Sequence, residues 1–149
     1  MKTTLSVLFI VGLLMACSSG KSAYRRGDYA DAVAKASTRF NQKRGLGRRG
    51  HELAGMVIQR AFVQSYEQHQ TAIRSLVQSR EPFRWERVYA EYEVLQKMTT
   101  DAWNALPNSD WLGTYPGDYT PRLTETRQLA ADERMALADT AYAYRTTTR

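Results

Sequence analysis

The sequence has one cysteine, two histidines and no long apolar run. A single cysteine cannot form an internal disulfide, so the fold must depend on an apolar core. The apolar stretch from Leu5 to Met15 has about eleven residues, whereas a transmembrane helix needs about 20. His51 and His69 are too far apart to share a helical face at zinc-ligand spacing, and no thiolate joins them. We therefore expect no membrane span and no metal site.

The residue patterns of enzyme active sites are also missing. Gly45, Gly47 and Gly50 have neither a strand before them nor a Lys-Ser/Thr pair after them, so they do not form a phosphate-binding loop. Ser and Asp residues occur without a partnered histidine for nucleophilic chemistry. The spacing predicts that His69 lies at the edge of an apolar helical face, with its polar nitrogen satisfied. We expect no catalytic residue, no cofactor and no small-molecule substrate.

The chain is basic, with a formal net charge of +6 at pH 7. Arginine outnumbers lysine, which suits pairing with carboxylates and phosphates. A basic domain suggests nucleic acid, but the export signal described next argues against such a partner. Anionic lipid headgroups, acidic envelope polymers or an acidic protein face are the expected counterparts.

The N-terminus contains the three parts of a secretory signal: the basic Lys2, the apolar stretch and small residues before Cys17. The tetrad Leu14-Met15-Ala16-Cys17 resembles the lipobox of bacterial lipoproteins. In that family the signal is cut before the cysteine, the thiol carries diacylglycerol and the new amine is usually acylated. The resemblance implies a signal peptide over 1–16, and a lipidated Cys17 with its tether over 17–22.

Ser18 bears on the destination of such a lipoprotein. Aspartate at this position tends to retain lipoproteins in the inner membrane, so Ser18 favours the outer membrane. We expect a protein anchored there by its lipid and facing the periplasm. The expected partners are then the membrane, through the anchor, and another envelope protein.

Residues 23–33 (AYRRGDYADAV) read as a helix end, a Gly-Asp-Tyr turn and a new helix. They resemble the helix-turn-helix of tetratricopeptide (TPR) repeats, in which Gly27 suits a left-handed C-cap and Asp28 an N-cap. Ala32 and Ala36 are small enough for two helices to approach closely. No second such turn follows at the repeat period of 34 residues.

The remaining periodicity predicts an all-α fold, with the TPR-like turn followed by three long antiparallel helices in one domain over 23–149. A first helix is expected from Tyr29 to Lys43. The long helices are expected at about 52–79, from Pro82 to about 106, and at 120–144. The second of these has the most regular apolar stripe: Trp85, Val88, Tyr92, Leu95, Thr99, Ala102 and Leu106. The last has a stripe of Leu123, Ala130, Leu137, Ala141 and Tyr144.

Two features are candidate interaction sites. A basic patch near the tethered end could rest on an anionic membrane surface; it comprises Arg25, Arg26, Lys43, Arg44, Arg48 and Arg49. The loop after Pro107 contains Trp111 and Tyr115, which either staple the helix ends together or form a recognition patch for a partner.

These features favour a lipid-anchored envelope protein that acts as a protein-binding scaffold or as an accessory subunit of an assembly or secretion complex. The alternative is a protein that binds or modifies the peptidoglycan cell wall. An enzyme of that kind would need a carboxylate with a perturbed pKa at an apolar face, for which Glu52, Glu67 and Glu86 are the candidates. Glu91 and Glu93 are expected on a solvated helical face.

Overall fold

The computed structural model describes residues 20–42 and 47–147, and all regular elements in this part of the chain are helical. The expectation of an all-α fold is therefore confirmed. The elements are α2 (Lys21–Arg26), α3 (Tyr29–Asn41), α4 (Arg48–Gln78), α5 (Arg84–Ala105), the 3-10 helix η2 (Asp110–Thr114) and α6 (Thr120–Thr147).

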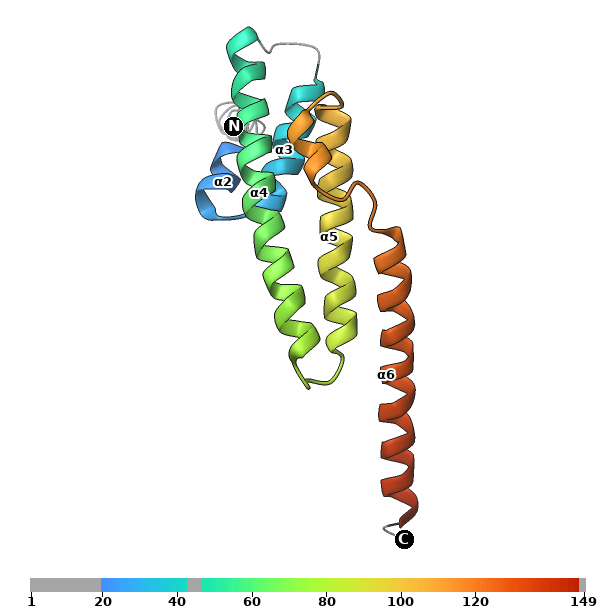
Figure 1. Cartoon of the computed structure of the whole chain (residues 1–149). Coiled ribbons are helices and arrows are strands. Elements are labelled where there is room, and N and C mark those ends of the chain that lie inside the picture. The colour runs from blue at the N-terminus through green and yellow to red at the C-terminus, as the bar shows by residue number, and fades with distance from the viewer. Residues whose placement is uncertain (1–19, 43–46, 148–149) are drawn as a thin grey trace, which may run out of the picture.

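Helices α4 and α5 form a long antiparallel hairpin that organises the molecule (Figure 1). Helix α3 packs against both at the end of the hairpin where α5 finishes, and α2 packs on α3 and α4. Helix α6 starts beside the middle of α5, runs antiparallel to it and extends past the α4–α5 turn (Figure 1). The hairpin thus has α3 at one end and α6 at the other.

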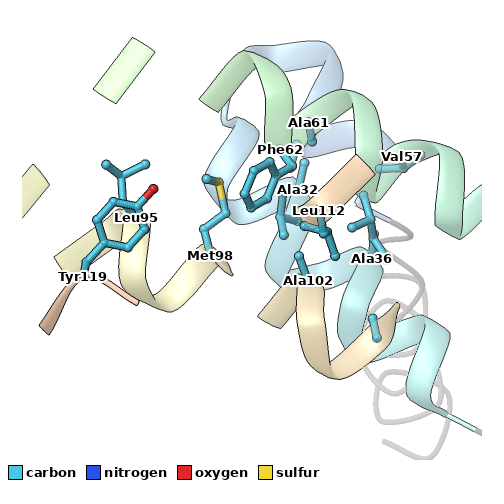
Figure 2. Packing of buried hydrophobic residues seen from close by; sticks show 14 of the residues in the cluster. Ala32, Ala36, Val57, Ala61, Phe62, Leu95, Met98, Ala102, Leu112 and Tyr119 are labelled. Carbon is cyan, nitrogen blue, oxygen red and sulfur yellow. The ribbon is translucent and has the colours of Figure 1, made fainter. Parts of the chain in front are cut away.

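The apolar stripe predicted for α5 does face the core. Val88, Leu95, Thr99 and Ala102 are buried. Figure 2 shows Phe62 of α4 beside Met98 of α5 and Leu112 of η2. The alanines of α3 complete this cluster, and their small size lets α3 approach both neighbours closely. Leu95 and Tyr119 lie together in a separate part of the core (Figure 2).

The α2–α3 turn follows the predicted pattern in its backbone. Gly27 closes α2 with a φ of 83°, a left-handed conformation that favours glycine. Asp28 occupies the N-cap position of α3 but makes no side-chain cap bond. Its carboxylate instead accepts a hydrogen bond from Arg26 Nε at 3.0 Å. Asp28 is therefore the N-cap residue, as predicted, but its side chain bonds to Arg26 and makes no capping bond.

The α4–α5 turn differs from the prediction at Pro82. This proline was expected in the first turn of the next helix, but α5 begins at Arg84. Phe83 between them has a φ of 61°, outside the right-handed helical region. The Trp85 N–H lies 3.4 Å from a carboxylate oxygen of Glu133 on α6. A carboxylate is favourable at a helix N-terminus, so α6 supplies the cap that the local sequence lacks.

Helix α6 buries only the first part of its predicted stripe. Thr126 is buried, and Leu123 and Ala130 are partly buried. Leu137, Ala141 and Tyr144 are exposed, because this half of α6 lies beyond the end of the hairpin (Figure 1). The expectation that the stripe faces the core along its whole length is wrong for residues 135–146.

Candidate functional site

Cys17 lies outside the described residues, but the structure shows where the chain that follows it is held. Gly20 is buried against α3. A Cβ atom at this position would lie 2.7 Å from the carbonyl oxygen of Ala32, and the φ of 68° also favours glycine. Lys21 and Ser22, expected in the tether, form the start of α2. Three chain steps separate Cys17 from Gly20, so their Cα atoms are at most about 11 Å apart.

The structure divides the predicted basic patch into paired and unpaired residues. Arg26 bonds to Asp28, and Arg48 Nε lies 3.2 Å from Glu52 Oε1. Arg25 has no ion-pair partner among the described residues, and the same holds for Arg49. Lys43 and Arg44 lie outside the described residues. Arg48 and Arg49, expected in a loop, begin α4.

Arg25 lies in a groove of about 220 Å³ between α2 and α4, which we call the α2–α4 groove. Lys21 and Arg60 join it at the rim. Leu53 and Met56, both on α4, supply apolar surface and are 41% and 49% exposed. Among the described residues, no acidic side chain lines this groove.

Sequence reasoning missed Lys21 and Arg60 as members of a basic site. Their spacing contained a usable signal. Lys21 and Arg25 are four residues apart and so share a face of α2. On α4, steps of four, three and four residues join Arg49, Leu53, Met56 and Arg60 into one stripe. Only the fold places these two faces side by side.

The aromatic residues of the loop pack onto α4. The ring centroid of Phe62 lies 5.4 Å from that of Trp111 and 5.1 Å from that of Tyr115. Tyr66 contacts Tyr115 edge to face at 4.8 Å. Both loop residues are partly buried, and Leu112 between them is fully buried. This is the packing expected of a staple. Partner recognition by Trp111 and Tyr115 stays a prediction.

A second groove, of about 600 Å³, lies between α5 and α6. Arg127 donates a hydrogen bond of 2.6 Å to the Tyr89 hydroxyl, and its guanidinium lies 5.3 Å from that ring centroid. Arg134 bonds to Glu86 across the same groove. This hydrogen bond lowers the pKa of the Glu86 carboxyl and raises the pKa of Arg134. Glu86 and Arg134 of this groove are therefore paired with each other, and Arg127 is hydrogen-bonded to Tyr89.

The candidate carboxylates do not form the site that an acid catalyst needs. Arg134 keeps Glu86 ionised, which is the opposite of a raised pKa. Glu52 and Glu67 are exposed. The part of the chain that the structure describes contains no group of three or more metal-ligating side chains.

One carboxylate lies in an unexpected place. Glu91 was expected on a solvated face, but it is partly buried and bonds to His69 Nδ1 across the α4–α5 interface. The expected edge position of His69 with a satisfied nitrogen is confirmed. Glu93 is exposed, as predicted. Glu91 is partly buried because α4 covers the side of α5 next to its apolar stripe as well as the stripe itself.

Burial also affects two tyrosines in the core. It raises the pKa of Tyr119 and, to a smaller degree, that of Tyr66. Tyrosine is protonated at neutral pH in any case, so this change in pKa leaves both residues as neutral packing groups in or against the core.

Comparison of the chain with protein-family models, curated proteins and solved structures finds no match. Within residues 20–42 and 47–147, no helix combines the length and apolar character needed to cross a membrane.

Proposed function

We propose that this protein is a lipid-anchored component of the bacterial cell envelope that binds another envelope protein, as a scaffold or as an accessory subunit of an assembly or secretion complex. The tetrad Leu14-Met15-Ala16-Cys17 supports the anchor. The packing of Gly20 against α3 fits such an anchor. Because Gly20 follows Cys17 by only three residues, a lipid on Cys17 would hold the helices close to the bilayer. Ser18 supports the outer membrane, facing the periplasm.

The observation that carries the binding role is the projecting half of α6, residues 135–146. Tyr142 is 74% exposed and Met135 is 67% exposed. They are seven residues apart and share a face, whereas Leu137 lies on the opposite face. A helix of this length has little stability in water without tertiary packing, and exposed apolar side chains are typical of contact surfaces. A partner that packs on this half of α6 would stabilise the helix and cover its exposed apolar side chains.

The geometry favours contact away from the anchor. Helix α2 lies beside the end of the hairpin that α3 covers, whereas the C-terminal end of α6 lies beyond the other end (Figure 1). The α2–α3 turn, with Gly27 and its adjoining Tyr24 and Tyr29 rings 5.3 Å apart, supports a single TPR-like unit as part of this proposal. It would brace the anchored end.

Site-specific photo-crosslinking in intact cells tests the binding role. A photoreactive amino acid at Tyr142 should give a discrete protein adduct, and the additional change Met135→Asp on the same face should remove it. Gln68, an exposed residue of α4, is the matched control position and should give none. The intact mass of the purified protein tests the anchor, since it should show a diacylglyceryl Cys17 and no residues 1–16.

Three results would contradict the proposal. An unmodified Cys17 removes the anchor. Equal adducts at positions 142 and 68 remove the specific surface on α6. Release of soluble fragments from purified peptidoglycan by the protein would show that it modifies the cell wall instead.

A further inference from the structure

We propose that the α2–α4 groove binds the headgroup of an anionic phospholipid in the membrane that holds the anchor. This inference rests on the proposed function, because the lipid on Cys17 is what brings the groove to a bilayer. It adds a specific lipid site to an anchor that by itself has no headgroup preference.

The charges of the groove are complementary to a phosphate. Lys21, Arg25 and Arg60 contribute three cations, and none of their side chains makes an ion pair or a hydrogen bond within residues 20–42 and 47–147. Arginine guanidinium groups suit bidentate contact with phosphate oxygens. The arginines nearby that do have partners, Arg26 and Arg48, do not line the groove.

The apolar surface of the groove distinguishes an amphiphile from a free anion. Leu53 and Met56 line the same groove as the cations and are about half exposed. Tyr24 adds an aromatic ring on the α2 side. A volume of about 220 Å³ is smaller than the ~300–1,000 Å³ of sites that enclose a drug-sized ligand. It accommodates a headgroup and the adjoining glycerol, whereas the acyl chains would stay in the bilayer.

The chain path brings this groove to the membrane surface. Gly20 is fixed against α3, and Lys21 at the groove rim is the next residue. The short reach from Cys17 to Gly20 therefore keeps the groove close to the lipid anchor. Basic residues near an anionic surface each add to membrane affinity, so an unpaired set at this point favours anionic lipids.

Native mass spectrometry of the full mature protein, extracted in detergent, tests the site. The sample is offered phosphatidylglycerol or phosphatidylcholine with identical acyl chains. We expect at least about tenfold more bound phosphatidylglycerol than phosphatidylcholine. The double variant Arg25→Gln/Arg60→Gln should lose this preference. The control Arg80→Gln/Arg145→Gln removes the same charge from exposed sites outside the groove and should retain it.

The two proposals fail in different readouts of this experiment. The denatured mass of the same sample reports lipidation of Cys17, and an unmodified mass overturns the proposed anchor alone. Equal retention of both phospholipids, or no retention of either, overturns the groove proposal. Equal loss in the two double variants also overturns it, because it shows a general effect of net charge. Circular dichroism confirms that the variants keep the helical fold.

Discussion

The two ends of the α4–α5 hairpin differ in how they are covered. At one end, α3 and η2 enclose Phe62, Met98 and Leu112, which are almost completely buried. At the other end, α6 packs on α5 with its first half only and then continues past the hairpin (Figure 1). Both ends are helical, so helix formation does not distinguish them.

The difference lies in the size and arrangement of the apolar side chains. Helix α5 concentrates large residues on one face, and such a face gains free energy when it is buried. The second half of α6 contains four alanines among polar and charged residues, and its large apolar residues lie on opposite faces. No single neighbouring helix can cover both faces. The comparison indicates that the covered end determines stability, whereas the projecting end is available for binding.

The largest effect is expected from a change in the covered end. Phe62→Ala removes a fully buried ring that contacts Trp111 and Tyr115, and we expect a loss of about 3–5 kcal/mol in the free energy of unfolding. Urea denaturation measures it. Tyr142→Ala in the projecting half should change the free energy of unfolding by no more than about 0.5 kcal/mol. Similar losses for both variants would remove the distinction.

An intermediate effect is expected where the chain enters the fold. Gly20→Ala would place a methyl group against the Ala32 carbonyl and force alanine into a left-handed backbone conformation. We expect a loss of about 1–3 kcal/mol, together with faster hydrogen exchange in α2. The control is Gly113→Ala, since an added Cβ there meets nothing within 4 Å. If Gly20→Ala behaves like this control, α2 is not held through Gly20.

The smallest effect is expected at the ion pair between Glu86 of α5 and Arg134 of α6, at the end of the hairpin that α6 covers. Glu86 has a pKa below 4.5 in the folded protein, since Arg134 stabilises its carboxylate. Its stabilising effect is therefore present above pH 4.5 and is lost as pH falls through the folded pKa. Glu86→Gln should accelerate hydrogen exchange in the first half of α6 at pH 7 by no more than about fivefold, because surface pairs are weak.

The pH dependence of this variant gives the sharper test. The difference from the wild type should shrink as pH decreases below 4.5, because the wild-type carboxylate becomes protonated. Glu125→Gln is the control, since Glu125 pairs with Arg122 within α6 and joins no two helices. A difference that stays constant between pH 7 and pH 3 would exclude the ion pair as its cause.

Much of the fold could be predicted because it depends on local patterns. The stripe of α5 follows from residue spacing, and the turn at Gly27 follows from the conformational freedom of glycine. The aromatic staple could be proposed, since Trp111 and Tyr115 are too large to stay unpacked near helix ends. The stripe and the turn are encoded within a few neighbouring residues, whereas the partners of the staple, Phe62 and Tyr66, lie on α4.

The candidate site was less predictable because it depends on which faces meet. Arg25 was a candidate from its position in the chain, but Arg60 is 35 residues away and joins it only through the packing of α2 on α4. The pairing of Glu91 with His69 was missed for the same reason. Side chains on different helices have no fixed relation until the helices are packed.

The sequence by itself determined that the chain is helical, where most helices begin and end, and which face of α5 is buried, because hydrogen bonds and side-chain periodicity within a helix are local. Only the tertiary structure decided that α6 stops being covered halfway, that Gly20 is fixed against α3 and that three cations meet in the α2–α4 groove. These outcomes depend on contacts between segments far apart in the chain, which no local pattern specifies.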